Sequence, residues 1–394
     1  MTDSSIHPTP LAERMAGIAP FHVMSLLARA QALEATGRSI IHMEVGEPDF
    51  PTPEPIVTAG IRALREGLTR YTPAVGLPRL RAAVAQHYDD AYGVDVPPER
   101  VLITPGGSGA LLLAIAVLVD PGREVLMADP GYPCNRHFVR MLDGRAVPIP
   151  VDAETRYQLT PELVERHWSE RTSAVILASP SNPTGTLLPV DALRGIVDIV
   201  AERGGRVIMD EIYQGLVYDR PSATALALSS EVFVVNSFSK YYGMTGWRLG
   251  WLVAPEPYLD DIERLAQNIF LAPATPAQYA ALAAFTPESE AILQERRRLL
   301  QERRDFLLPA LRELGFAIPV QPEGAFYLYA DCSAFSTDSR AFAGRVLEEA
   351  GVAITPGVDF GEHRADSHLR FAYTAEVPRL ADAVERLRRF LDGA

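Results

Sequence analysis

The stretch AVILASPSNPTGTLLPVDALRGIVDIVAERGGRVIMDEIY, residues 174–213, contains two short apolar runs joined by a segment with helical spacing. The runs at 174–178 and 206–209 are almost wholly apolar, which predicts β-strands buried on both faces. Apolar residues between 190 and 203 recur as on one face of a helix. A strand, a crossover helix and a second strand are typical of a parallel sheet, so this stretch predicts an α/β fold.

The same pattern extends on both sides of this unit. Helical segments alternate with five further apolar runs, at 101–104, 124–129, 145–151, 232–236 and 248–254. Together the seven runs predict a mostly parallel seven-stranded sheet between helices. Ligands of such sheets bind at the carboxyl ends of the strands, where this chain places its unusual polar residues.

A smaller α/β unit is expected after the sheet. Strands are predicted at 325–330, 352–355 and 368–373, and helices at 289–314, 339–350 and 377–391. A further strand at 39–45 follows a helix at 21–35 near the N-terminus. We expect a large domain at 49–275 and a small domain made of the N-terminal segment 1–48 and residues 276–394.

Composition narrows the class of protein. The 394-residue chain has a net charge of −13, from 37 basic and 50 acidic side chains, which argues against nucleic acid and anionic membranes as partners. Two cysteines are too few for a disulfide framework, and no histidine pattern is typical of a metal site. No signal peptide is evident at the N-terminus and no apolar run is long enough to span a membrane, so a cytoplasmic protein is expected.

Lys240 is the only lysine in the chain, because the other 36 of the 37 basic residues are arginines. Chance survival of a surface lysine is one interpretation. The other is a task that arginine cannot perform, since a lysine amine can lose its proton and attack a carbonyl to form an imine.

Two further motifs surround this lysine in the predicted fold. Gly106-Gly107-Ser108-Gly109 joins a strand to a helix, where backbone N–H groups favour an anion, although small residues there are often only a tight turn. The segment SFSKYYGMTGWRLGW, residues 237–251, adds Ser237, Ser239 and Arg248. A phosphate held by Ser108, Ser237, Arg248 and the Gly107 turn would lie near the amine, as a phosphorylated aldehyde cofactor requires.

From about Val45 to Ala375 the sequence resembles the class I/II aminotransferases of fold type I, which use pyridoxal 5′-phosphate. The motifs that carry the resemblance are S-x-S-K-x-x-x-x-x-G-x-R-x-G, S-P-S-N-P-T-G at residues 179–185, D-E-I-Y and R-x-x-Y. The family implies that Lys240 forms the imine (internal aldimine) with the cofactor and later moves the Cα proton. Asp210 would pair with the pyridinium nitrogen, although a strand-end carboxylate that caps the next helix is the plainer interpretation.

The resemblance also implies roles for other residues. Tyr213 and Asn182 would hydrogen-bond the ring hydroxyl, and Tyr132 would stack on the ring, although an aromatic residue in such a turn is more often packing. Arg370 and the Gly46 turn would bind the substrate α-carboxylate. Tyr71 would reach the phosphate of a neighbouring subunit, which implies a homodimer with shared sites.

The substrate side chain is less strongly indicated. Aspartate-type relatives often carry lysine where Ser108 stands, and small hydroxyl residues where Phe21-His22-Val23 stand. These departures favour a neutral or apolar amino acid, with a 2-oxo acid such as 2-oxoglutarate or pyruvate as acceptor. His22 is more simply a packed histidine than a substrate contact.

Three alternatives stay open. The first is an aspartate-type aminotransferase. The second is a carbon–sulfur β-lyase of this fold, although those enzymes tend to carry histidine where Tyr213 stands. The third is a pyridoxal-phosphate-binding sensor without catalysis, which the complete lysine and arginine set and the lack of a basic DNA-binding module make the weakest.

Overall fold

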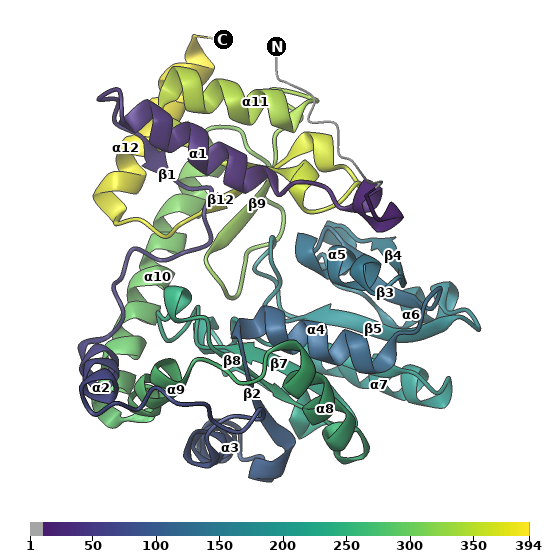
Figure 1. The fold of residues 1–394 in the computed structure, drawn as a ribbon. Helices are drawn as coiled ribbons and strands as arrows, with labels where there is room; N and C mark the ends of the chain where they lie inside the picture. The colour runs from purple at the N-terminus through teal and green to yellow at the C-terminus, as the bar shows by residue number, and fades with distance from the viewer. Residues whose placement is uncertain (1–10, 394) are drawn as a thin grey trace.

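A mixed seven-stranded sheet forms the centre of the protein in this computed structural model, which describes residues 11–393 (Figure 1). Its order is β2-β8-β7-β6-β5-β3-β4. The strands are β2 Val101–Thr104, β3 Glu124–Asp129, β4 Arg145–Pro150, β5 Thr172–Ala178, β6 Arg206–Asp210, β7 Phe233–Ser237 and β8 Gly250–Val253. All neighbours are parallel except β8, which runs antiparallel to both β2 and β7. The predicted α/β class and mostly parallel sheet are confirmed.

Helices cover both faces of the sheet. Successive residues of a strand point to opposite faces, so the strands are apolar at successive positions. Val175 packs in the core cluster that includes α3, α6 and α7, whereas its neighbour Ile176 packs in the cluster that includes α4, α5 and α8. These helices are α3 Pro78–Tyr92, α4 Gly106–Leu118, α5 Pro133–Met141, α6 Pro161–His167, α7 Val190–Glu202 and α8 Leu259–Ile269. Burial on both faces is what the continuous apolar runs predicted.

The second part of the fold joins segments from the two ends of the chain (Figure 1). Strand β1 (Ile41–His42) pairs in parallel with β10 (Val352–Ala353), and a three-stranded antiparallel sheet has the order β11-β12-β9. Its strands are β9 Tyr327–Asp331, β11 Thr355–Pro356 and β12 His368–Ala372. The accompanying helices are α1 His22–Glu34, α10 Pro287–Glu313, α11 Ser339–Arg345 and α12 Val377–Asp392, with a π-helical turn at Val346–Ala350.

Two further helices contact those already described, the first packing on α10 and the second on α3. They are α2 Glu54–Arg65 and α9 Thr275–Ala281, which pack on each other. We propose the division into 1–48 with 276–394 and 49–275 as domains, and the pairing of β1 with β10 supports the grouping of the two ends. Residues 1–10 of the predicted N-terminal segment lie outside the described residues.

Several predicted boundaries were wrong. The strand expected at 39–45 is only Ile41–His42, because β10 offers two pairing residues and Glu44 to Gly46 turn into the site instead. The strand expected at 352–355 is divided into β10 and β11, which belong to different sheets. Helix α9 was not predicted. Helix α4 begins at Gly106, so the glycine-rich motif forms its first turn and not a separate loop.

The run Glu295-Arg296-Arg297-Arg298 on α10 is less exposed to solvent than its charged composition suggests. Arg298 is exposed and pairs with Glu295 at 2.6 Å, as expected for a solvated face. Arg296 is half-buried, with its guanidinium carbon 5.3 Å from the centre of the Phe50 ring. Arg297 is also half-buried. The run is therefore solvated on one face of the helix only.

Candidate active site

The predicted site residues converge at one edge of the large sheet. Asp210 ends β6 and Ser237 ends β7, and these neighbouring strands are parallel, so both residues reach the same edge. Because β8 is antiparallel, the segment that precedes it arrives at this edge as well. This corrects the expectation that Arg248 begins the last strand, since Arg248 lies two residues before β8 with a φ of 52°.

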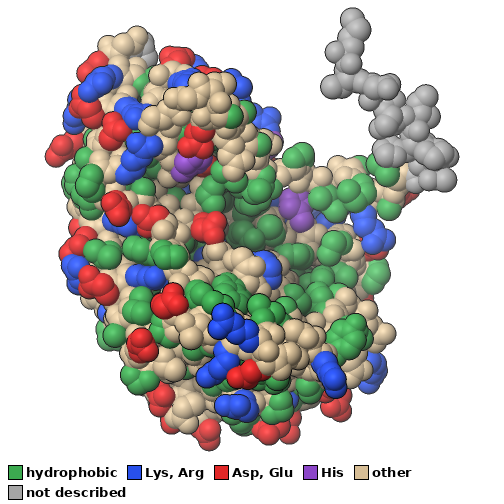
Figure 2. Space-filling model, turned by 60° about the vertical axis from the view of Figure 1, so that its left-hand side comes forward, with side chains coloured by type: hydrophobic (Ala, Val, Ile, Leu, Met, Phe, Trp, Pro, Cys, Tyr) green, Lys and Arg blue, Asp and Glu red, His purple; other side chains and the backbone are tan. Residues whose placement is uncertain are grey.

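A cavity of about 270 Å³ lies at this edge. Figure 2 shows that the surface is hollowed between two lobes and that hydrophobic side chains gather around the hollow. The predicted site residues that line the cavity are Gly46, Gly107, Ser108, Tyr132, Asn182, Asp210, Tyr213, Ser237, Ser239, Lys240, Arg248 and Arg370. Of the predicted set, only Tyr71 is not among its lining residues.

Lys240 extends from the loop after β7 into this cavity. Its Nζ donates a hydrogen bond to the carbonyl oxygen of Gly46 over 2.8 Å. Burial lowers the pKa of Lys240 to about 8, and the cations Arg370 and Arg248 act in the same direction against the opposing charges of Glu47 and Asp210. A substantial fraction of the amine is therefore unprotonated near neutral pH, which a nucleophilic amine needs.

Asp210 places a buried carboxylate in the same cavity, with the side chain 6% exposed. Its Oδ1 accepts a hydrogen bond from the Ile212 amide at 3.0 Å. Burial raises the pKa of Asp210 to about 6, although that hydrogen bond and Lys240 oppose the shift. A buried carboxylate with no cation in direct contact is suited to a ligand that brings its own positive charge.

The N-terminus of α4 and the segment between β7 and β8 form a cradle for an anion. Ser237 Oγ donates to Ser239 Oγ over 2.9 Å, and both hydroxyls line the cavity with Ser108. Arg248 lies against the α4 N-terminus, since a Cβ atom on Gly106 would stand 2.8 Å from the Arg248 guanidinium. Helix N–H groups, hydroxyls and a guanidinium in one place favour a phosphate.

Gly250 explains how these segments can approach so closely. A Cβ atom at Gly250 would lie 2.7 Å from the Asn236 carbonyl oxygen and 2.8 Å from the Gly107 nitrogen. Only a residue without a side chain lets β8 pass between β7 and the first turn of α4 at this point.

Arg370 on β12 reaches the cavity with its side chain 3% exposed. Its Nη1 donates to Asn182 Oδ1 over 2.9 Å, and its Nη2 donates to the Glu44 carbonyl oxygen over 2.5 Å. The guanidinium carbon lies 4.3 Å from the ring centre of Tyr327 and 4.8 Å from that of Phe360. Its buried Nε has no hydrogen-bond partner among the described residues, so the clamp keeps a donor for a ligand carboxylate.

Tyr327 is a site residue that the sequence reasoning missed. Its hydroxyl lies 2.9 Å from that of Tyr213, and it also occupies the space that a side chain at Gly46 would need. The preceding Gly324-Ala325-Phe326 is a short apolar stretch, and nothing in its pattern points to a ligand. Only the packing of β9 against the other elements reveals that Tyr327 lines the cavity.

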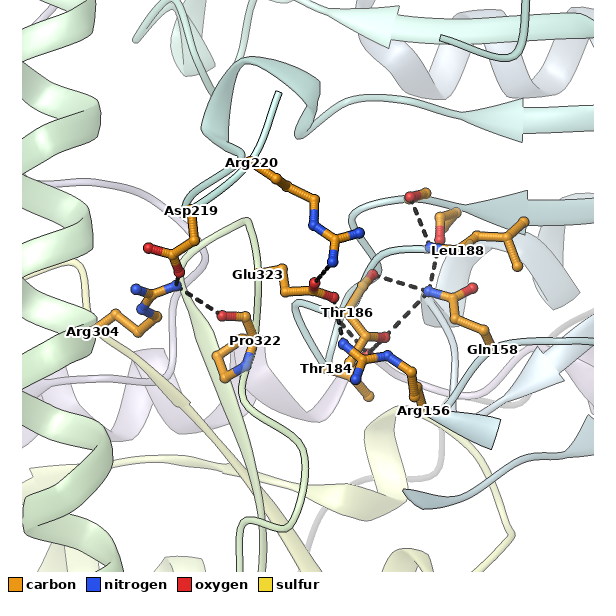
Figure 3. A network of polar contacts seen from close by, with 12 residues as sticks. Arg156, Gln158, Thr184, Thr186, Leu188, Asp219, Arg220, Arg304, Pro322 and Glu323 are labelled. Carbon is orange, nitrogen blue, oxygen red and sulfur yellow. Dashed lines mark hydrogen bonds and ion pairs between the residues drawn. The ribbon is translucent and has the colours of Figure 1, made fainter. Parts of the chain in front are cut away.

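The loop that leads to Tyr327 is held by charged groups from both parts of the fold, Arg156 and Arg220 from the large part and Arg304 from α10 (Figure 3). Glu323 pairs with Arg156 at 2.5 Å and with Arg220 at 2.8 Å. The neighbouring carbonyl of Pro322 accepts a hydrogen bond from Arg304 over 3.1 Å. These contacts fix the approach of β9, and so they help to place Tyr327.

The remaining predicted residues have different surroundings. Tyr132 lines the cavity at the start of α5. Tyr71 is 82% exposed and does not line the cavity, so no described residue of its own chain holds it over the site. His22 is absent from the cavity wall, where Phe21, Val23 and Met24 are present, and its ring contacts Arg340 instead.

Neither metals nor membranes are indicated by the described part of the chain. Residues 11–393 contain no group of three histidine, cysteine, aspartate or glutamate side chains placed to hold a metal ion. None of their helices is long and apolar enough to cross a membrane. Cys134 and Cys332 are both free thiols.

A reactive buried amine, a buried carboxylate and an anion cradle at the end of a parallel sheet define an enzyme that binds a phosphorylated carbonyl cofactor. The family described as aminotransferase class I and II matches residues 38–387, and the chain belongs to this family. It is therefore a transaminase, and the cofactor of the family is pyridoxal phosphate.

Individual relatives are similar over nearly the whole chain. A valine–pyruvate aminotransferase from Mycobacterium tuberculosis is 38% identical, covering 95% of this chain and 97% of the relative. A (5-formylfuran-3-yl)methyl phosphate transaminase from Methanocaldococcus jannaschii is 36% identical, covering 97% and 100%. The solved aspartate aminotransferase from Thermus thermophilus with maleate is 34% identical, covers 97% and 100%, and superposes with a TM-score of 0.92.

The residues present fit pyridoxal phosphate. The unpaired Asp210 carboxylate matches a pyridinium nitrogen, the cradle of Gly107, Ser108 and Arg248 matches a phosphate, and the Lys240 amine matches the aldehyde. When bound, the cofactor supplies an electron sink for the carbanion that forms when the substrate loses its Cα proton.

Proposed function

We propose that the chain transfers the amino group of a neutral or apolar L-amino acid to a 2-oxo acid such as pyruvate or 2-oxoglutarate. The observation that carries this proposal is the composition of the cavity wall. Phe21, Val23, Met24 and Leu111 line it, whereas its only cationic side chains are Lys240, Arg248 and Arg370. We assign each of these three cations to the cofactor or to the substrate α-carboxylate. The described residues of the cavity wall therefore leave no cation to bind an acidic substrate side chain.

The proposed roles follow from the contacts. Lys240 holds the cofactor and later carries the proton between Cα and the amine, because its pKa of about 8 permits both protonation states. Asp210 keeps the ring nitrogen protonated, and Asn182 and Tyr213 hydrogen-bond the ring hydroxyl. Gly107, Ser108, Ser237, Ser239 and Arg248 bind the phosphate, and Tyr132 stacks on the ring.

Arg370 and the backbone at Gly46 bind the substrate α-carboxylate. Asn182 and Glu44 hold two nitrogens of the Arg370 guanidinium, and the rings of Tyr327 and Phe360 hold its plane. A fixed fork loses little freedom when a carboxylate binds, so it favours one orientation of the substrate.

The relatives support two donor classes. The valine–pyruvate aminotransferase favours an apolar donor. Relatives named aspartate or aspartate/prephenate aminotransferase, at 31–36% identity, support an aspartate-type enzyme as the second candidate. The cavity wall favours the first.

A screen of the common L-amino acids with pyruvate and with 2-oxoglutarate tests this. We expect kcat/KM for valine, leucine or another apolar donor to exceed that for aspartate. The opposite order would establish the aspartate-type enzyme, and pyruvate release from cysteine-like substrates without an acceptor would indicate a β-lyase.

We propose that the chain acts as a homodimer in which Tyr71 of one subunit reaches the phosphate of the other. The support is the exposure of Tyr71 together with a site to which it contributes nothing within its own chain. Sedimentation velocity of the holoenzyme should give a dimer, and Tyr71→Phe should weaken cofactor retention without altering the sedimentation coefficient.

A further inference from the structure

A second cavity of about 640 Å³ adjoins the cofactor cavity. It lies beside α5 and strands β3, β4 and β5, and Tyr132 and Ala178 line both cavities. Gly17, from the short 3₁₀ helix Glu13–Gly17, forms part of its wall. Of its residues, the proposed transamination uses only Tyr132 and Phe360, whose ring packs on Arg370.

The cavity wall combines apolar side chains with polar and charged ones. Its apolar side chains come mainly from the sheet and include Met127, Pro148, Leu159, Ile176 and Leu177. A volume between about 300 and 1,000 Å³ with such a lining is typical of a site for a small organic molecule.

Two side chains of the wall carry a buried polar atom without a hydrogen-bond partner among the described residues, Asn135 at Oδ1 and His137 at Nδ1. Asn135 is only 5% exposed, and its Oδ1 makes no hydrogen bond within the described residues. Buried amide groups are normally paired, so this one is explained by a ligand that completes it. A half-turn about the Cβ–Cγ bond presents the amide nitrogen at the same place, so Asn135 can donate as well as accept.

Two arginines of the cavity wall have no carboxylate partner among the described residues. Arg136 and Arg140 lie four residues apart on α5, and neither forms an ion pair among residues 11–393. Arg136 donates instead to the Asp359 carbonyl oxygen over 2.6 Å. Arg145, which also lines the cavity, differs because it pairs with Glu124 at 3.3 Å.

The acidic residues of the wall limit the charge of the ligand. Asp129 is satisfied by the amides of Glu362 and His363, at 3.0 and 3.2 Å. Glu362 has no cationic partner among the described residues and would repel a second anionic group. One negative charge near Arg136 and Arg140 therefore fits better than two.

We propose that this cavity is a second ligand site, which binds a monocarboxylate with an apolar body. Its carboxylate lies against Arg140 and Asn135, and its body lies on the apolar wall formed by the sheet. The proposal of a second site does not depend on which amino acid is the donor, because the second cavity shares no charged residue with the cofactor cavity.

Calorimetric titration of the holoenzyme with 4-phenylbutyrate tests the proposal. Because this probe can also enter the catalytic cavity, the titration is made in an Arg370→Leu background, which removes the proposed carboxylate clamp there. We expect one remaining site per chain and weaker binding of the neutral amide, 4-phenylbutyramide.

Variants of the second cavity give the decisive comparison. In the same background, Arg140→Ala should weaken the probe about tenfold or more, because a charge-assisted hydrogen bond is lost. Ala146→Phe should block the cavity, and Asn135→Leu, which keeps the side-chain volume, should also weaken binding. Arg389→Ala on α12 is the matched control and should change nothing.

Two results would overturn the proposal. One is the loss of all binding in the Arg370→Leu protein, which would place the probe only in the catalytic cavity. The other is unchanged binding in both Arg140→Ala and Ala146→Phe. Transamination by Arg140→Ala with the wild-type Arg370 should keep its rate, and this shows that the variant is folded.

Discussion

Arg370 and Asn182 are joined by a hydrogen bond of 2.9 Å from Nη1 to Oδ1, although 188 positions separate them in the chain. The first comes from β12, the central strand of the small three-stranded sheet, and the second from the loop after β5 of the large sheet. This bond links the proposed carboxylate clamp to the proposed cofactor contact. A substrate bound at Arg370 is thereby oriented relative to the ring.

Arg370→Lys should raise KM for the amino acid by about tenfold to a hundredfold, with a smaller change in kcat. Lysine keeps the charge but loses the planar fork that Asn182, Tyr327 and Phe360 hold. Steady-state kinetics with the preferred donor measures this. Arg345→Lys, which changes an exposed arginine on α11 paired with Glu349, is the control, and an unchanged KM in Arg370→Lys would refute the assignment.

Lys240→Arg should abolish transamination and the covalent attachment of the cofactor, because arginine stays protonated and cannot form an imine. Borohydride reduction of the wild-type holoenzyme, followed by proteolysis and mass spectrometry, should find the pyridoxyl group on the peptide that contains residue 240. The chain offers no other lysine, so the result is unambiguous. Reduction that labels no peptide, or normal turnover by Lys240→Arg, would disprove the mechanism.

The sequence predicted the large sheet well because burial on both faces leaves a strong signal. The run at 124–129 is apolar at its four inner positions, and β3 has the same bounds. The polar residues after such runs were found for the same reason, since Asp210 and Ser237 stand out against their strands. Parallel neighbours then bring them together without any detail of side-chain packing.

What the sequence could not predict depends on long-range packing. The strand at 39–45 is short because only two residues of β10 are available to pair with it. Tyr327 reaches the site because its loop is fixed by Arg156 and Arg220, which are distant in sequence. The role proposed for Tyr71 would depend on a second chain, and the sequence of one chain cannot position that residue.

Gly250→Ala should weaken cofactor retention, because the new methyl group would meet the Asn236 carbonyl and the first turn of α4 at 2.7–2.8 Å. Either the strand or the phosphate cradle must then move. Equilibrium binding of pyridoxal phosphate to the apoenzyme measures the effect, and we expect a loss of affinity of about tenfold or more. Gly246→Ala is the matched control, since a Cβ atom there meets nothing within 4 Å. Equal affinities in the two variants would contradict the proposed cradle.

His42 should make the stability of the fold dependent on pH. Its Nδ1 lies 2.7 Å from Oε1 of the fully buried Glu44, and its Nε2 lies 3.2 Å from Glu34. The hydrogen bond to Glu44 raises the pKa of His42 to about 9, with smaller contributions from the charges of Glu44 and Glu34 and with burial opposing them.

The sign of the effect follows from this raised pKa. A histidine that is more basic in the folded protein stabilises the fold fully below its ordinary pKa of 6.5, and it loses that contribution as the pH rises through about 9. The His42 side chain is 34% exposed, so solvent reduces the contribution to about 1 kcal/mol. His42→Gln should therefore be less stable than the wild type by about this amount near pH 6, and the difference should disappear near pH 10. Urea unfolding of both proteins at the two pH values measures the difference in their free energies of unfolding. The contributions of other titrating groups cancel in this difference, because both proteins contain them. A deficit of the same size at both pH values would show that His42 acts through packing and not through its charge.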